Sequence, residues 1–311
     1  MLGRTANGLY WMFRYIERAE NIARLVDAGQ RMSLTRSGAV EDDWDGVLQS
    51  AGVREAYDEV HSKLTGADAI DYLMRDRSNP SSVMSCIEYG RNNARMVRTA
   101  LTRDTWEATN ECWIELKALL GKRLKTAELP ETIDVIKRRA GLIRGAFHGS
   151  MLRNELYNFA RMGTFIERAD NTARILDTKY HILLPSVADV GGAVDYYQWA
   201  SLLQSLSGFE AYRKIYSDVI SPRRIAELLI LRDDMPRSLH SCMNFIHETL
   251  QLLCDAQSRE IERQAGAMHA RIHYGRTDDI MDFGLHEYLI DFLEHISRLG
   301  AEVSKAFLVP V

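Results

Sequence analysis

Two short stretches of this sequence place glutamate, asparagine and arginine where they could do chemistry. In the first stretch, Glu17, Asn21 and Arg24 are spaced so that one face of a helix would hold all three. Such a face can bind a carboxylate or a phosphate, because a guanidinium grips two oxygens at once while a glutamate positions it or acts as a base. The same groups can instead form a buried ion-pair network that fixes how helices pack.

The second stretch repeats the first one 150 residues later. Residues 15–27 (YIERAENIARLVD) and 165–177 (FIERADNTARILD) agree at eight of thirteen positions. On an exposed helix such charge pairs contribute only roughly a few tenths of a kcal/mol each. Because both copies keep the polar groups, we favour the buried network and keep the ligand site as the alternative. The candidate set is Arg14, Glu17, Arg18, Asn21, Arg24, Glu167, Arg168, Asn171 and Arg174.

A second candidate site lies at the helix start predicted by Asn79-Pro80. The residue before a proline disfavours helix, and proline suits the first turn. The free N–H groups of such a turn can hold a phosphate, and Met235-Pro236 begins a matching segment in the second half. Helix capping explains the same residues, with Ser78 or Asn79 as the cap. The candidate anion site comprises Ser82, Ser85, Arg237 and Ser238.

Metal and cofactor motifs are missing from the sequence. His269 and His273 stand four residues apart, a spacing that suits two ligands of one metal. However, no HExxH surrounds them, and paired Glu-x-x-His motifs of a dimetal bundle are not found. We therefore expect two surface or packing histidines, no metal and no cofactor. Nucleotide-binding glycine motifs and the GxSxG nucleophile motif are also not found.

Composition excludes several classes of function. The net charge of the 311 residues is −4, with an isoelectric point near 6.2, so the charge gives no general attraction to nucleic acid. The N-terminus lacks the apolar segment of a secretory signal, and no stretch is apolar enough to span a membrane. No two of the four cysteines form a CxxC pair, and a reducing compartment suits them. We expect a cytoplasmic protein.

Patterning predicts an all-α fold. Only six prolines interrupt the chain, and the apolar residues of 5–34 recur with helical period. A helix capped by Thr102 or Asp104 is expected next to one opened by Pro130 that continues, with bends, to residue 184. Gly141, Gly145 and Gly149 form a bare stripe there, which predicts either close approach of another helix or a kink.

Three collinear matches predict an internal duplication. The paired segments are 15–27 with 165–177, 44–57 with 199–212, and 79–86 with 235–242. Their order is preserved while the offset drifts from 150 to 156. We therefore predict a helical bundle of two pseudo-symmetric repeats of about 150 residues. Residues 1–150 form the first repeat and residues 151–311 the second, packed as one compact body about a pseudo-twofold axis.

The opening segment 1–21, MLGRTANGLYWMFRYIERAEN, resembles the alpha-E family of bacterial proteins, which is all-helical and named for its Glu-Arg motif. The second Glu-Arg stretch and the Asn79-Pro80 turn fit as well, whereas Gly8 and Met235 depart from the expected pattern. The resemblance implies a genomic setting. Members are encoded beside, and sometimes fused to, a circularly permuted ATP-grasp protein, with transglutaminase-like proteins and a proteasome-like peptidase as further neighbours.

The resemblance therefore implies an accessory or substrate-presenting partner of an ATP-grasp amide or peptide ligase, without catalytic activity of its own. One alternative is an enzyme of the same pathway, in which Glu17 and Glu167 do acid/base work and the arginines grip a carboxylate or phosphate. A second alternative is a structural scaffold that forms homo-oligomers. No nucleic-acid or membrane partner is expected.

Overall fold

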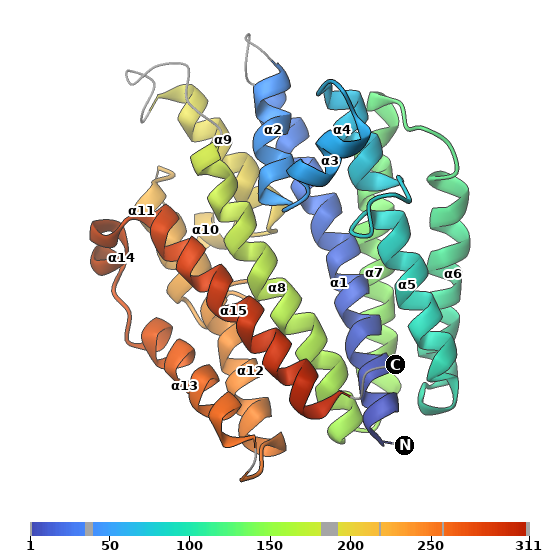
Figure 1. Cartoon of the computed structure of the whole chain (residues 1–311). Coiled ribbons are helices and arrows are strands. Elements are labelled where there is room, and N and C mark those ends of the chain that lie inside the picture. Colours follow the sequence, from blue (N-terminus) through green and yellow to red (C-terminus); the bar gives the residue numbers. More distant parts are fainter. Residues whose placement is uncertain (1, 35–39, 182–191, 218, 257, 309–311) are drawn as a thin grey trace. The chain divides into compact units, whose positions relative to one another are not determined.

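The structure is a computed structural model that describes residues 2–34, 40–181, 192–217, 219–256 and 258–308. The described residues form helices and turns and contain no strand (Figure 1), which confirms the predicted all-α fold. The helices are α1 (Leu2–Ser33), α2 (Val40–Ser50), α3 (Arg54–Val60), α4 (Gly66–Met74), α5 (Val83–Met96), α6 (Arg103–Leu119), α7 (Leu129–Ser150), α8 (Glu155–His181), α9 (Ala193–Ser205), α10 (Phe209–Tyr216), α11 (Pro222–Ala226), α12 (Leu239–Leu253), α13 (Arg259–His273), α14 (Thr277–Phe283) and α15 (Leu285–Phe307). Shorter turns are η1 (Arg98–Ala100), η2 (Thr126–Glu128) and η4 (Glu227–Leu231).

The chain divides into two compact units, and each half of the sequence contributes to both. Unit 1 comprises Met1–Ala23, Ala67–Glu167 and Gly300–Val311, and unit 2 comprises Arg24–Gly66 and Arg168–Leu299. The polypeptide passes from one unit to the other inside α1, α8 and α15, and also directly after Gly66, the first residue of α4. Helices α1, α8 and α15 therefore each contribute several residues to both units.

Unit 1 is built on α5, α6 and α7, with α6 packed against both neighbours (Figure 1). Aromatic rings fill part of its core: Phe147 lies 4.4 Å from Phe13 and stacks on Tyr157 at 5.1 Å between centroids. Close packing of α1 against α8 depends on Gly163, because a Cβ there would lie 2.3 Å from the carbonyl oxygen of Tyr10. Only glycine allows this approach.

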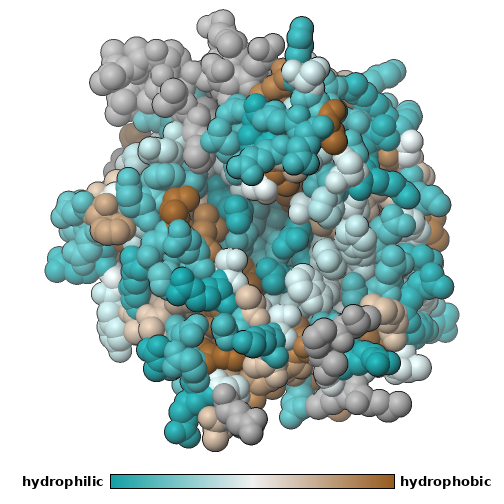
Figure 2. All heavy atoms as spheres, viewed as in Figure 1, coloured by the Kyte–Doolittle hydropathy of each residue, from teal (hydrophilic) through white to brown (hydrophobic). Residues whose placement is uncertain are grey.

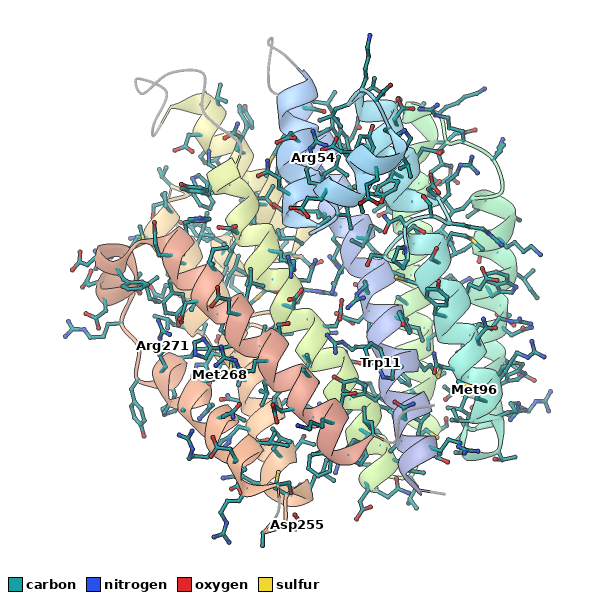
Figure 3. The ribbon with its side chains drawn as sticks, in the orientation of Figure 1. Trp11, Arg54, Met96, Asp255, Met268 and Arg271 are labelled. Carbon is teal, nitrogen blue, oxygen red and sulfur yellow. The ribbon has the colours of Figure 1, made fainter. Side chains whose placement is uncertain are left out.

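Unit 2 contains α12 and α13 as a packed helix pair, with η4 against both. Ser238 caps α12 by accepting a hydrogen bond from the backbone N–H of Ser241 at 2.9 Å. This cap satisfies one of the donors that the first helical turn leaves unpaired. Met268 and Arg271 project from α13 (Figure 3). Both line a cavity to which residues of α15 also contribute.

Several predicted boundaries are confirmed and others are wrong. Thr102 caps α6, and Pro130 lies in the first turn of α7, as predicted. The helix expected at Pro80 begins instead at Val83, because the Ser82 side chain caps it. The long helix expected from Pro130 is two helices, α7 and α8, since the backbone of Met151 is extended; its expected end at residue 184 lies outside the described residues.

The glycine stripe of α7 does not serve close packing. A Cβ at Gly141, Gly145 or Gly149 would meet no atom of the described residues within 4 Å, so the predicted close approach is wrong. Helix α7 is not broken there either, because it runs through all three glycines; the kink that the stripe also predicts stays a prediction. The close approach of two backbones occurs at Gly163, on a different helix.

On the face shown in Figure 2, hydrophilic side chains cover most of the surface and apolar ones occur in small separate groups. None of the helices in the described part of the chain has the length and apolar character needed to cross a bilayer.

Candidate functional site

Glu167 of α8 is the centre of an ion-pair cluster within unit 1. Arg18 donates from Nε and Nη2 to its two carboxylate oxygens over 2.5 and 2.9 Å, and Arg14 donates from Nε over 3.0 Å. The Glu167 side chain is only 5% exposed. Burial raises the pKa of Glu167, but the guanidiniums of Arg18 and Arg14 outweigh burial and bring the pKa below its ordinary value. The carboxylate is therefore charged at neutral pH.

Helical spacing on α1 positions the two arginines. Arg14 and Arg18 lie one turn apart, so both guanidiniums reach the same carboxylate. Arg14 also donates to the Tyr10 hydroxyl over 3.0 Å and lies 5.1 Å from the ring of Trp11, which projects from α1 (Figure 3). Burial raises the pKa of Tyr10, so its hydroxyl keeps its proton. These contacts hold Arg14 in place.

Glu17 and Glu20 share a third arginine, Arg144 of α7. Its Nη1 lies 2.9 Å from Glu17 and 2.5 Å from Glu20, and both glutamate side chains are 1% exposed. Asn21 donates to the backbone carbonyl of Glu167 over 3.4 Å. The polar face of α1 is thus a buried network in unit 1, and Arg144 is a member that sequence reasoning missed.

The arginines at the end of each motif have a different role, within unit 2. Arg24 donates from Nη1 to the Ser205 carbonyl over 2.6 Å, at the C-terminal end of α9. Arg174 donates from Nη1 to the Ser50 carbonyl over 3.4 Å, at the C-terminal end of α2. A cation at these carbonyls satisfies acceptors that the last helical turn leaves unpaired. Arg24 and Arg174 therefore each cap a helix from the opposite half of the sequence.

The two remaining motif residues, Arg168 and Asn171, belong to α8. Arg168 is half-buried and Asn171 is buried. Neither they nor the other motif residues line either of the two cavities described below.

The four residues proposed for an anion site are engaged in capping and packing. The Ser82 hydroxyl accepts from the backbone N–H of Ser85 at 3.2 Å and lies 2.9 Å from its hydroxyl. Ser238 caps α12 and also donates to the Arg232 carbonyl. Arg237 is buried, and its carbonyl accepts from Thr172 at 2.9 Å. This geometry favours capping as the explanation of the serines.

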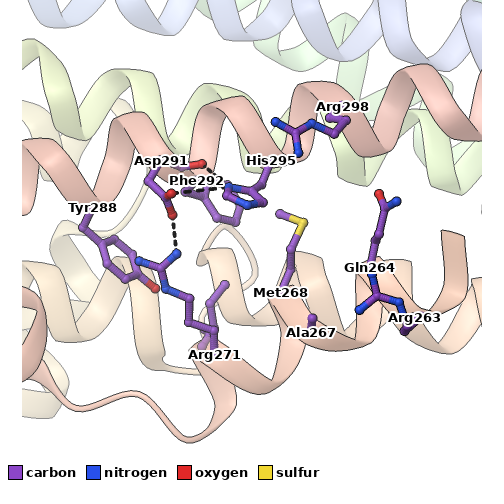
Figure 4. Close-up of a pocket in the computed structure, with 11 residues that line it drawn as sticks. Arg263, Gln264, Ala267, Met268, Arg271, Tyr288, Asp291, Phe292, His295 and Arg298 are labelled. Carbon is purple, nitrogen blue, oxygen red and sulfur yellow. Dashed lines mark hydrogen bonds and ion pairs between the residues drawn. The ribbon is translucent and has the colours of Figure 1, made fainter. Parts of the chain in front are cut away.

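A cavity of about 310 Å³ lies between α13 and α15 in unit 2 (Figure 4). It is lined by Arg263, Gln264, Ala267, Met268, Arg271, Ile272, Tyr288, Asp291, Phe292, His295 and Arg298. Met268 and Phe292 make it partly apolar, and its lining contains three arginines and one carboxylate, that of Asp291. A second hollow, in unit 1, is lined by His148, Arg153, Tyr157 and Arg161.

The arginines of the α13–α15 cavity differ in how far they are neutralised. Arg271 pairs with Asp291 and lies 4.9 Å from the Tyr288 ring. Arg263 pairs with Glu260 at 2.6 Å. Arg298 is exposed and has no ion-pair partner among the residues that the structure describes. An exposed arginine beside apolar side chains suits an anionic group carried by a partly apolar ligand.

A family described as "a predicted alpha-helical domain with a conserved ER motif" matches residues 1–308. The chain belongs to the Alpha-E family. Two Glu-Arg pairs occur in this Alpha-E chain within the repeated stretches, Glu17-Arg18 and Glu167-Arg168. In the second pair, Glu167 is the buried carboxylate that Arg14 and Arg18 bind.

Similar curated proteins are longer than this Alpha-E chain. The uncharacterized proteins Mb2597 of Mycobacterium bovis and Rv2567 of Mycobacterium tuberculosis are each 24% identical to it over 315 residues. The alignments cover 94% of this chain but 35% of each relative, so the chain spans about a third of their length. No solved structure matches the chain.

Proposed function

We propose that this Alpha-E protein is a non-catalytic partner of an ATP-grasp amide or peptide ligase, to which it presents a carboxylate-bearing, peptide-like substrate. The cavity between α13 and α15 is the observation that carries the proposal. Its apolar side chains suit the body of a peptide, and Arg298 is available for a carboxylate. The presentation of a substrate needs such a cavity but needs no catalytic group.

The state of the motif glutamates supports a role without catalysis. A general acid or base must come within hydrogen-bond reach of the substrate. Glu17 is buried against Arg144, and Glu167 is buried between Arg14 and Arg18. Such carboxylates are held as charged partners of arginines, a state that suits packing better than proton transfer.

Sequence context supports the partner. The family resemblance implies genes for ATP-grasp proteins as neighbours or fusions. In the curated relatives, about two thirds of the length lies outside the aligned region. A helical module that occurs within longer chains suits a protein that works beside a separate domain with catalytic activity.

We also propose that the chain is an internal duplication of a helical unit of about 150 residues. Equivalent turns follow α2 and α9: Val53 N–H bonds to Leu48 O, and Gly208 N–H bonds to Leu203 O. Gly52 and Ser207 both have positive φ at these turns. The caps by Arg24 and Arg174 are also equivalent, because each arginine binds the end of the corresponding helix in the other half of the sequence. Two related surfaces that pack together make such reciprocal contacts.

Purification with the ATP-grasp protein encoded beside it tests the proposal. We expect a stable complex and ligase turnover that rises when this protein is added. Arg298→Glu should keep the complex and raise the KM for the carboxylate substrate at least about tenfold, because it replaces an attractive charge by a repulsive one. Arg103→Glu, an exposed arginine on α6, is the matched control and should change neither value.

Three results would contradict parts of this picture. If no complex forms and turnover is unaffected, the partner role is wrong. If the complex forms but Arg298→Glu leaves the KM unchanged, the cavity does not hold the substrate. If the purified chain turns over the substrate alone and Glu17→Gln abolishes that turnover, the protein is an enzyme.

A further inference from the structure

Four histidine rings of unit 2 gather where α12 packs against α13. His240 and His247 belong to α12, whereas His269 and His273 belong to α13. Ring centroids lie 5.2 Å apart for His240 and His273, 5.3 Å for His269 and His273, and 5.0 Å for His247 and His269. One nitrogen from each of His240, His269 and His273 lies within 4.8 Å of the other two.

Hydrogen bonds orient two of these rings as metal ligands are usually oriented. The Nδ1 of His240 lies 2.7 Å from the Leu231 carbonyl oxygen. A carbonyl only accepts, so Nδ1 carries the proton and Nε2 keeps its lone pair. In the same way, Nε2 of His269 lies 2.7 Å from the side-chain oxygen of Asn244, which leaves a lone pair on the other nitrogen. Such outer contacts fix the tautomer of a metal-binding histidine.

The spacing of two nitrogens matches a tetrahedral metal. Two ligands that each lie about 2.0–2.1 Å from zinc are about 3.3–3.4 Å apart at the tetrahedral angle. His240 Nε2 and His273 Nδ1 are separated by 3.2 Å. One nitrogen of His269 lies within 4.8 Å of a nitrogen of each of the other two rings, which places a third ligand beside this pair.

Charge around the cluster favours neutral imidazoles. Within the described part of the chain, none of the four rings bonds to a carboxylate that would stabilise a positive charge. Neutral imidazole is the form that binds metal.

The ring of His247 packs beside the cluster, against His269. It stacks on His269, and Gly266 leaves room for it, since a Cβ there would lie 3.2 Å from His247 Cε1. His273, by contrast, is exposed to solvent. The cluster is therefore packed on one side and open to water on another.

We propose that His240, His269 and His273 bind a zinc ion whose fourth position is open to water. Three imidazole ligands suit zinc among the metals available to proteins. The sequence alone shows only the His269–His273 pair, and α12 adds the third ligand.

Metal binding by the purified full-length chain tests the site. After treatment with a chelator, the chain should bind one Zn²⁺ per molecule, and Co²⁺ in its place should give the visible absorption of tetrahedral cobalt. Zinc should raise the thermal midpoint, and EDTA should reverse the rise, because the ion binds only the folded chain. His273→Gln and His240→Gln should each weaken zinc binding at least about tenfold, and Asn244→Ala should do so about tenfold through the orientation of His269.

His148→Gln, in unit 1, is the control and should bind zinc as the unchanged chain does. His273 is exposed, so its variant keeps the fold, and circular dichroism checks this before binding is measured. If the chain binds no zinc, or if the double variant H240Q/H273Q binds one equivalent with unchanged affinity, the proposed site is wrong.

Discussion

Removing a carboxylate that is buried between two guanidiniums lowers the free energy of unfolding far more than removing one on the surface. Glu167 accepts from Arg14 and Arg18, and both arginines are largely buried with it. If the carboxylate is neutralised, both cations stay in place without their counter-charge. The motif glutamate is thus important because of the arginines around it, rather than because of its own burial.

We predict that Glu167→Gln lowers the free energy of unfolding at pH 7 by about 3–5 kcal/mol. Denaturation in urea, followed by circular dichroism, measures this change. Glu59→Gln is the matched control, because Glu59 is exposed, and it should change stability by less than about 0.5 kcal/mol. Equal effects of the two substitutions would mean that the ion pairs of Glu167 contribute nothing.

The same variant should show a defined pH dependence. The folded-state pKa of Glu167 lies below its ordinary value. Its contribution to stability is therefore complete above the unfolded pKa of about 4.3 and is lost as the pH falls through the folded pKa. The difference between the unchanged chain and Glu167→Gln should be constant from pH 7 to about 5 and should shrink below about pH 4. A gap that widens on acidification would contradict this assignment.

At the scale of helices, two glycines that both lie inside helices have opposite roles. Gly163 lets α8 approach the α1 backbone at Tyr10, whereas Gly145 of α7 faces open space. Helical glycine is unfavourable relative to alanine by about 0.5–1 kcal/mol. At Gly145 that cost has no compensating contact in the described residues.

We predict that Gly145→Ala raises stability by about 0.5–1 kcal/mol and that Gly163→Ala lowers it by about 1–3 kcal/mol through overpacking. The two substitutions add the same methyl group, so each is the control for the other. Thermal midpoints of both variants, measured side by side, decide the question. A midpoint of Gly163→Ala at or above that of the unchanged chain would show that α1 and α8 can separate without loss.

The sequence reveals local features of the helices better than contacts between them. Caps such as Thr102 and the proline that opens α7 are visible because the residues that act are neighbours along the chain. Arg144 and His240 could not be found in this way, because their partners lie on other helices. The glycine stripe of α7 is a further example. The spacing of its glycines shows that they share one face of the helix, but it does not show which residues pack against that face.

At the scale of the whole molecule, the four cysteines report on unfolding. Cys86, Cys112 and Cys242 are buried and Cys254 is half-buried. Burial raises the pKa of Cys86 and of Cys112 to about 12, so neither thiol is ionised at neutral pH.

We predict that a thiol reagent labels Cys254 first in the native protein and the other three only when the structure opens. Mass spectrometry after timed labelling identifies the modified residues. In Cys254→Ser the early phase should disappear and the slow phase should remain. Early labelling of Cys86 would instead show that unit 1 opens without global unfolding.

The passage of α1, α8 and α15 through both compact units has a consequence for how the gene arose. Residues 1–150 supply parts of both units, and so do residues 151–311. On the proposed duplication, an ancestor with one copy held no complete unit in its own chain. It could have folded only by associating with a second, identical chain, and the duplication then joined an obligate dimer into one polypeptide.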